Sequence, residues 1–360
     1  MAISALLKAS GRTETQVPIS FRRHVKRLAQ GFVYWSGIEG CMPRRSSAVV
    51  LMYHSVEMPE ASKYIDPAWS MTLKCFERQI RFLARRRHVI PLSELVELLK
   101  NGREPKPGSV VLTFDDGYKD NFYVVAPILR HYGLPATISL ATDYVTSGEN
   151  QPIDRLYAIF RTHTRARIKL PFSDGVEVNT IYDLRQPSHW KLAYQICAQQ
   201  LSQSTREQRE QILAYIEQQL EPTKCPPRLI LNWQEVRELT RQYPEIEIGA
   251  HTAQHVDLSV ADAATIREEL RKCIEDLERE MGVRPRHFCF PYGRSNSLAR
   301  RLVAEAGFES AMGPSGPFAV DASTSAYCLP RVNAHISGTQ LKFYTHPGFT
   351  ALPRWLARRG

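Results

Sequence analysis

The sequence predicts an α/β protein built on a mostly parallel sheet. Short runs of β-branched and apolar residues, which are typical of strands, alternate with segments of helical periodicity. The strand-like runs are continuously apolar, as expected where a parallel sheet is buried on both faces. Polar residues able to do chemistry stand directly after these runs, where parallel strands present ligand sites. With 360 residues and 43% hydrophobic content, the chain can form one large domain or two ordinary ones.

The alternation of strands and helices starts near residue 47 and is interrupted once. Strand-like runs lie in the segments 48–54, 109–117, 135–142, 245–255 and 287–293. Helical periodicity marks the segments 73–87, 121–133, 261–282 and 297–307. In the segment 261–282, Ile266, Leu270, Ile274, Leu277 and Met281 form one apolar stripe, and Gly282 is placed to end the helix.

Three further segments stand apart from this alternation. Residues 1–45 form a basic extension whose apolar residues lie on one helical face, which suits either a membrane surface or, as we prefer, packing against the domain. The domain itself is expected over residues 46–345, with an insertion or lid at about 148–227 that holds two helices. Ser204 and Glu207 form a capping box at the second of these helices. Residues 346–360 form a basic tail.

Charge and cysteine content restrict the class of partner and the compartment. Lys and Arg number 47 against 37 Asp and Glu, a net charge of +10 that favours an anionic glycan, a membrane surface or nucleic acid. Nucleic acid is the weakest of the three, because no binding signature is present. Seven dispersed cysteines without a CxxC pair indicate a reducing compartment. No apolar run approaches the roughly 20 residues needed to cross a bilayer. We therefore expect a cytoplasmic protein without nucleic acid, and peripheral membrane contact through residues 1–45 stays open.

Polar residues follow four of the predicted strands. His54 ends the first, the pair Asp115 and Asp116 ends the second, His251 and His255 follow the strand at 245–250, and the tripeptide 291–293 follows the strand at 287–290. Because parallel strands end at the same rim, these distant segments are expected to meet there.

The histidine pair predicts a metal site. His251 and His255 are separated by three residues, so one helical turn or a tight loop can aim both rings at one point, and Asp116 completes a set of three ligands. Alone, such a histidine pair is more often a surface or packing feature. We expect a divalent cation, zinc first, with cobalt, nickel or manganese as alternatives.

Two adjacent carboxylates repel each other unless a cation neutralises one of them. We therefore expect Asp116 to bind the cation while Asp115 stays free to take a proton from water. His54 suits a general acid that protonates the leaving group. The tripeptide Pro291, Tyr292 and Gly293 is able to form a turn whose N–H groups stabilise an oxyanion. Each of these interpretations has an alternative. The aspartate pair could simply cap the next helix, His54 could be a buried histidine without a catalytic role, and residues 291–293 could form a turn without a function.

These residues resemble the polysaccharide deacetylases of carbohydrate esterase family 4. "TFDDGY", "HTAQH" and "FPYG" are similar to the family's three motifs, and the likeness covers about residues 49–332 apart from the insertion. The resemblance implies a distorted (β/α)7-type barrel and metal-dependent removal of acetyl groups from sugars. It also implies that Asp116, His251 and His255 bind the metal and that Asp115 is the base. The Tyr292 N–H would form part of the oxyanion hole.

The third motif departs from the family pattern. Cys289 stands where the family has an arginine that orients the base, and we expect Arg331 to fill that role from another strand. The family's late strand carrying the acid histidine is also missing. A subgroup that acts on poly-N-acetylglucosamine in biofilm export is similar to this chain in having a "YH" strand before the aspartate motif, which amounts to a permuted barrel. "LMYH" fits this arrangement, so His54 is preferred as the acid over His335 and His346.

Three functions remain open at this point. The first is a metal-dependent hydrolase that removes acetyl groups from N-acetylated sugars of a cell-surface or exported polysaccharide, or of its lipid-linked precursor. The second is an amidase acting on a small C–N compound with the same fold and metal. The third is a non-catalytic glycan-binding protein, which the departure at Cys289 favours and the intact aspartate pair opposes.

Overall fold

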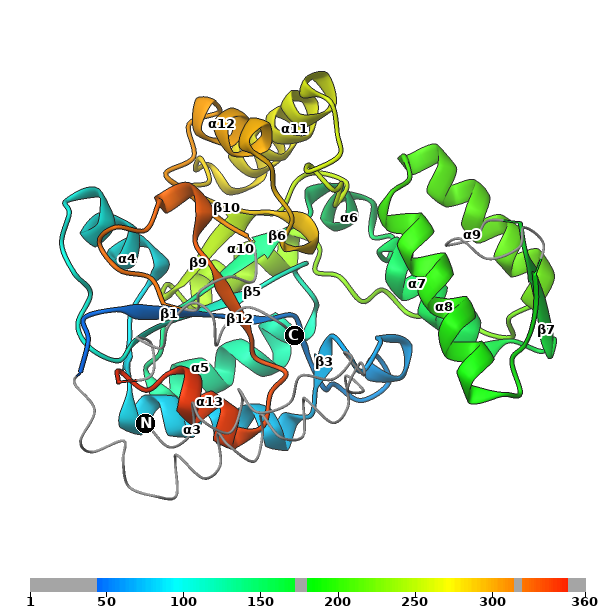
Figure 1. Cartoon of the computed structure of the whole chain (residues 1–360), viewed down its shortest axis with the longest axis horizontal. Coiled ribbons are helices and arrows are strands. Elements are labelled where there is room, and N and C mark those ends of the chain that lie inside the picture. Colours follow the sequence, from blue (N-terminus) through cyan, green and yellow to red (C-terminus); the bar gives the residue numbers. More distant parts are fainter. Residues whose placement is uncertain (1–43, 172–179, 314–318, 349–360) are drawn as a thin grey trace, which may run out of the picture.

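The computed structural model describes residues 44–171, 180–313 and 319–348 (Figure 1). The strands are β1 Ala48–Tyr53, β2 Ser55–Val56, β3 Ser70–Met71, β4 His88–Val89, β5 Ser109–Phe114, β6 Ala136–Leu140, β7 Arg167–Leu170, β8 Thr180–Asp183, β9 Ile246–Ala250, β10 His287–Cys289, β11 Ser310–Met312 and β12 Arg331–Asn333. The α-helices are α3 Leu73–Arg86, α4 Leu92–Lys100, α5 Ala126–Tyr132, α6 Thr142–Ser147, α7 Pro152–Thr162, α8 Pro187–Ser202, α9 Arg206–Leu220, α10 Trp233–Gln242, α11 Ala263–Met281, α12 Ser297–Glu305 and α13 Gly338–Tyr344. Short 3₁₀ turns occupy Ser62–Tyr64, Pro291–Gly293 and Ala326–Cys328, and a π-helical turn occupies Asn121–Val125.

Seven parallel strands form a nearly closed barrel. Their order is β11-β10-β9-β6-β5-β1-β12, and the short β4 also pairs with β5. The two ends of this order meet, because Leu329, two residues before β12, forms a parallel bridge with Met312 of β11. The predicted distorted (β/α)7-type barrel is confirmed.

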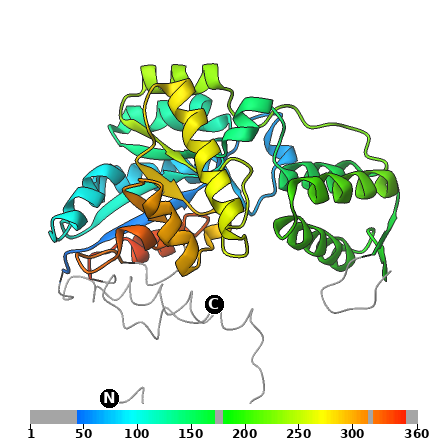
Figure 2. The ribbon, with the colours of Figure 1, turned by 90° about the horizontal axis from the view of Figure 1, so that it is seen from above.

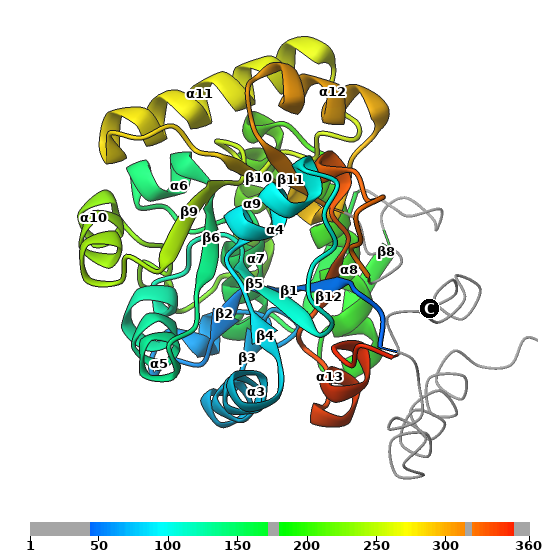
Figure 3. The same ribbon diagram turned by 90° about the vertical axis from the view of Figure 1, so that its left-hand side faces the viewer.

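The apolar runs of the sequence are explained by burial on both sides of the strands. All six residues of β5 and all five of β6 are buried. Helices surround the strands on the outside, and α4 lies across the end of the barrel opposite α7–α9 (Figure 3). Leu95 and Val96 of α4 pack in one cluster with Val50 and Val111 from the barrel strands.

The long helix α11 follows its sequence pattern closely. The side chain of Asp262 accepts a hydrogen bond from Thr265 N at 2.8 Å and caps the first turn. Gly282 ends the helix in the left-handed conformation, with φ 69°. The predicted stripe faces the core, although Met281 at its end is only half-buried.

The insertion contains more structure than the sequence predicted. Three helices, α7, α8 and α9, and the hairpin β7–β8 pack around a hydrophobic cluster of their own and project from the barrel (Figure 2). Only α8 and α9 were expected. The capping box of α9 is one residue later than predicted, at Thr205 with Gln208, because the Ser204 hydroxyl donates back to Gln200 O at the end of α8.

Some predictions concern residues outside the described part. The N-terminal helix expected within residues 1–45 falls almost wholly in 1–43, and most of the tail 346–360 lies beyond residue 348. The boundaries of these segments, of the domain at 46–345 and of the insertion at about 148–227 stay predictions. Among the described residues, none of the helices is long and apolar enough to cross a membrane.

Candidate active site

The loops after four parallel strands meet at one end of the barrel. His54 follows β1, the aspartate pair follows β5, His251 and His255 follow β9, and Pro291–Gly293 follow β10. All of these loops line one cleft of about 960 Å³. The expectation that these segments share a rim therefore agrees with the geometry.

Asp116, His251 and His255 form a compact group of ligand atoms. Asp116 Oδ1 lies 3.5 Å from His251 Nε2 and 3.4 Å from His255 Nε2. Ligand atoms about 2.0–2.2 Å from a tetrahedral zinc lie roughly 3.3–3.6 Å from one another. Asp116 Oδ1 is also buried without a hydrogen-bond partner in the described part of the chain, which is costly unless a cation or water satisfies it. The residues present thus fit a divalent cation.

Both histidines face Asp116 with Nε2, and their rings are in the form that binds a cation. His251 Nδ1 lies 2.8 Å from the Cys289 carbonyl oxygen, which only accepts hydrogen bonds, so Nδ1 carries the proton and Nε2 is bare. Burial lowers the pKa of His255 to about 3, with Asp116 opposing this shift. A neutral ring with a bare nitrogen is the form that binds metal.

The backbone is strained at these positions. Asp116, Thr252, His255 and Tyr292 all have positive φ values, between 53° and 74°, and they are four of the six such non-glycine residues in the described chain. Strain of this kind persists where the surrounding structure enforces it and concentrates at functional sites. Next to Asp116, Gly117 has φ 73°, and a Cβ there would lie 2.5 Å from the Leu140 side chain.

Asp115 forms a buried ion pair with Arg331. Arg331 Nη1 donates to Asp115 Oδ1 at 2.7 Å, and both side chains are almost fully buried. Burial alone would raise the pKa of Asp115, but Arg331, with His251 and His54, outweighs it and holds the pKa well below the usual range. The structure therefore places Arg331 against the predicted base, from a strand that pairs with β1.

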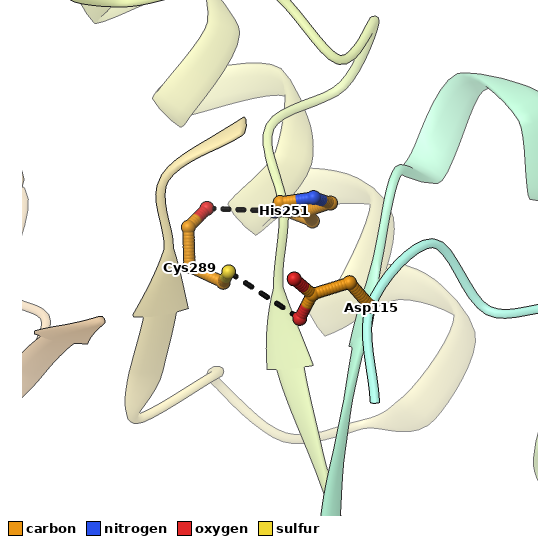
Figure 4. A group of neighbouring side chains, drawn as sticks. All are labelled: Asp115, His251 and Cys289. Carbon is orange, nitrogen blue, oxygen red and sulfur yellow. Dashed lines mark hydrogen bonds between the residues drawn. The ribbon is translucent and has the colours of Figure 1, made fainter. Parts of the chain in front are cut away.

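A second trio, Asp115, His251 and Cys289, also has ligand atoms close together (Figure 4). Cys289 Sγ lies 3.4 Å from Asp115 Oδ1, which already accepts from Arg331. Burial raises the pKa of the Cys289 thiol well above its usual range, and Asp115 adds to this despite Arg331. Asp115 Oδ1 is thus engaged by Arg331, whereas Asp116 Oδ1 has no hydrogen-bond partner in the described part of the chain, so the group around Asp116 is the better cation site.

His54 stands beside the predicted base. Its Nε2 lies 3.9 Å from Asp115 Oδ2, and its ring centroid lies 4.8 Å from that of Trp69. Burial lowers the pKa of His54, against the opposing effect of Asp115, so the ring is neutral in the free protein. His335 and His346 do not line the cleft.

The tripeptide after β10 forms a tight turn, as expected. Gly293 N and Arg294 N donate to the carbonyls of Phe290 and Pro291 and close it, and the Tyr292 N–H takes no part in these bonds. The Tyr292 ring packs against His255, with centroids 4.7 Å apart. The turn thus lies next to the ligand group.

Sequence reasoning missed two contacts from the insertion to the site. The Tyr118 hydroxyl, in "TFDDGY", lies 3.1 Å from both carboxylate oxygens of the buried Asp154 in α7. Arg209 of α9 is also buried, and its guanidinium donates to the carbonyls of Gln254 at 2.8 Å and His255 at 3.3 Å. Neither contact has a local sequence signal, because each depends on how the insertion packs against the barrel.

Arg209→Met is expected to weaken metal binding about tenfold or more and to lower the free energy of unfolding by about 2 kcal/mol. The change leaves the carbonyls of Gln254 and His255 without their charged donor and loosens the ligand loop. Competition with a chromogenic chelator and urea denaturation measure the two effects. Arg206→Met, on the same helix, is the control, because Arg206 pairs with Asp143 and Glu149 and not with the loop. Unchanged metal affinity in Arg209→Met would contradict the role of this residue.

Comparisons with known proteins agree with the geometry. The profile of a family described as polysaccharide deacetylase matches residues 102–311. That segment contains the aspartate pair, His251, His255 and Tyr292, whereas His54 after β1 and Arg331 on β12 lie outside it. YxkH of Bacillus subtilis (strain 168) is 31% identical over 90 residues, which is 25% of this chain and only 30% of that relative.

Several solved structures share the fold. The deacetylase PplD of Streptococcus pyogenes, in complex with acetate, is 16% identical with a TM-score of 0.52, and the match covers 84% of this chain and 99% of PplD. IcaB of Ammonifex degensii is 14% identical with a TM-score of 0.54, covering 85% of this chain and 98% of IcaB. A de-N-acetylase of Aggregatibacter actinomycetemcomitans is 16% identical with a TM-score of 0.52, covering 83% and 99%.

Proposed function

This chain belongs to the polysaccharide deacetylase family, and from that membership we propose that it is a metal-dependent hydrolase of acetylated sugars. Its substrate would be the N-acetyl groups of a cell-surface or exported polysaccharide, or of the lipid-linked precursor. The proposal rests on one observation, which is that the two adjacent carboxylates, Asp115 and Asp116, have different neighbours. Asp116 faces two histidines, and Asp115 faces an arginine.

Asp116, His251 and His255 would hold the cation, with zinc as the first candidate. A divalent cation held by these residues would supply Lewis-acid chemistry: it would polarise a carbonyl group and lower the pKa of water toward neutrality. Because Arg331 donates to its Oδ1, Asp115 would stay unligated and keep Oδ2 for the reaction.

Asp115 would accept the proton of the attacking water at Oδ2. Its Oδ1 is occupied by Arg331, whereas Oδ2 faces His54 Nε2 at 3.9 Å. Because Arg331, with His251 and His54, outweighs burial and holds the pKa of Asp115 well below its usual range, the carboxylate is ionised before the reaction. His54 is the neighbouring acceptor, and it would deliver the proton to the amine nitrogen as the C–N bond breaks.

The turn at Pro291–Gly293 would stabilise the oxyanion on the acetyl carbon. The Tyr292 N–H is not used in closing the turn, so it is available as a donor. The peripheral membrane contact through residues 1–45 and the cytoplasmic location stay predictions from the sequence.

Purified protein is expected to release acetate from N-acetylglucosamine oligomers in a chelator-sensitive manner. Removing the cation with dipicolinate should lower the rate about a thousandfold or more, because several kcal/mol of transition-state stabilisation is lost. Added zinc should restore it. Release that a chelator leaves unchanged would contradict metal dependence. Absence of release from every acetylated glycan tested would contradict the deacetylase assignment.

A further inference from the structure

His54 lies between two strands that belong to different sheets. Strand β1 of the barrel ends at Tyr53, and β2, which starts at Ser55, pairs with β3 in a separate two-stranded sheet. The chain thus leaves the barrel at the residue proposed as the general acid. The direction of its imidazole therefore depends on how the start of β2 is held.

Two buried side chains from the segment after β5 hold this junction. Asn121 Nδ2 donates to the main-chain oxygen of His54 at 3.0 Å. Asp120 accepts from Val56 N at 2.9 Å through Oδ1 and from the Ser55 hydroxyl at 2.7 Å through Oδ2. Asn121 Nδ2 also donates to Asp120 Oδ1 at 2.9 Å. Both side chains are almost fully buried, so water competes little for these contacts.

The same anchor extends to the aromatic ring that packs against His54. Ser55 N donates to the Trp69 carbonyl at 3.1 Å, and Ser55 pairs with Ser70 where β2 meets β3. The Trp69 ring lies against the His54 imidazole, with centroids 4.8 Å apart. By holding Ser55, Asp120 fixes both the main chain next to His54 and the strand pair that carries its aromatic neighbour.

One short segment therefore carries the base and holds the acid. Asp120 and Asn121 lie in the same stretch as Asp115, "DDGYKDN", and Asp115 Oδ2 lies 3.9 Å from His54 Nε2. A π-helical turn, a rare form that is frequent at functional sites, starts at Asn121. Neither Asp120 nor Asn121 lines the cleft, so both act on the acid from behind and not on a substrate.

This anchor keeps a carboxyl group in the core at an energetic cost. Burial raises the pKa of Asp120 to about 7, although its donors Val56 N, Ser55 and Asn121 oppose the shift. The hydrogen bonds therefore do not fully offset the lost hydration. Packing alone does not require a carboxylate here, whereas a carboxylate can accept from a main-chain N–H and a hydroxyl at the same time.

We propose that Asp120 and Asn121 are positioning residues, which fix the His54 imidazole against Asp115 so that it can deliver a proton to the departing amine. Both act through the main chain and side chains of residues 54–56. This inference rests on the proposed function for its catalytic consequence, whereas the orientation of His54 can be measured without a substrate.

Asn121→Leu removes both donor bonds of the amide with little change in volume. It should lower kcat for acetate release from N-acetylglucosamine oligomers about thirtyfold and change KM less than about threefold, because a displaced acid loses much of its contribution. Hydrolysis of p-nitrophenyl acetate should change less than about threefold, since nitrophenolate leaves without being protonated. An equal loss on both substrates would show that Asn121 only supports the fold, and the proposal would be overturned.

Ser55→Ala guards against a variant that merely misfolds. It removes one hydroxyl that donates to Asp120 and leaves the main-chain contacts in place, so the amide rate should fall about three- to tenfold while the aryl ester rate is kept. Asn150→Leu is the matched control, because Asn150 is also a buried amide that donates to a main-chain oxygen, that of Pro227 at 2.8 Å. It should change both rates by the same factor. If neither Asn121→Leu nor Ser55→Ala changes the ratio of the two rates, the proposal is wrong.

NMR of the full-length protein with isotope-labelled histidine measures the orientation of His54 directly. The wild type should show one set of His54 ring signals, assigned by their loss in His54→Gln, and Asn121→Leu should split or broaden them. Unchanged His54 signals in Asn121→Leu would overturn the proposal. If the wild type releases no acetate, the deacetylase function fails, while altered His54 signals in Asn121→Leu still support the anchor.

Discussion

Replacing Asp115 with asparagine is expected to lower kcat for acetate release about a thousandfold while metal affinity stays within a few-fold of wild type. The amide oxygen can still accept the Arg331 hydrogen bond, but the side chain can no longer take a proton from water. A positioned general base contributes roughly 10²- to 10⁴-fold. Because the candidate cation site of Asp116, His251 and His255 does not include Asp115, the metal should remain. Steady-state kinetics and metal content measured on the same preparation check both expectations.

Asp116→Asn is the matched control, because it makes the same chemical change one residue away. It removes the negative charge that faces both histidines, so the metal and the activity should be lost together. If Asp115→Asn keeps activity within tenfold of wild type, Asp115 is not the base. If Asp115→Asn loses the metal and Asp116→Asn retains it, the two aspartates have the opposite roles.

Arg331→Met is expected to lower the free energy of unfolding by about 3–5 kcal/mol, because it leaves the buried Asp115 without its partner. The guanidinium is among the largest fully buried groups of the described chain, so solvent cannot replace it. Urea denaturation of the metal-free protein measures the change. Activity should also fall, since Asp115 loses the contact that fixes its orientation.

Two further variants make the Arg331 prediction specific. Arg130→Met breaks an exposed pair with Glu245 and should change stability little, since solvent screens such pairs. The double variant Asp115→Asn with Arg331→Met should recover part of the lost stability, because no unpaired charge then remains buried. A double variant that is no more stable than Arg331→Met alone would show that the loss arises from packing and not from the ion pair.

The sequence predicted much of the barrel and the rim of the site. Continuous apolar runs identified buried parallel strands, and the residues just after them had to lie at the strands' common end. For this reason the amino-acid pattern predicts that Asp116 lies at the same rim as His251 and His255, although they are far apart in the chain. The capping box predicted at Ser204 lies one residue later, at Thr205. Both residues carry a hydroxyl able to cap α9, and the sequence does not show that the Ser204 hydroxyl donates instead to Gln200 O at the end of α8.

By itself, the sequence predicted five of the seven barrel strands, β1, β5, β6, β9 and β10, and the chemistry at their ends, since both depend on residues close together in the chain. The other two barrel strands, β11 and β12, are only three residues long. Only the tertiary structure decided which of those ends touch. Arg331 meets Asp115 across 216 positions because β12 pairs with β1, and Arg209 reaches the His255 loop because α9 packs there. Helix α7 and the hairpin β7–β8 likewise depend on packing, because they surround the insertion's own hydrophobic cluster. Such contacts leave no local pattern, because their energy depends on strand order and burial rather than on neighbouring residues.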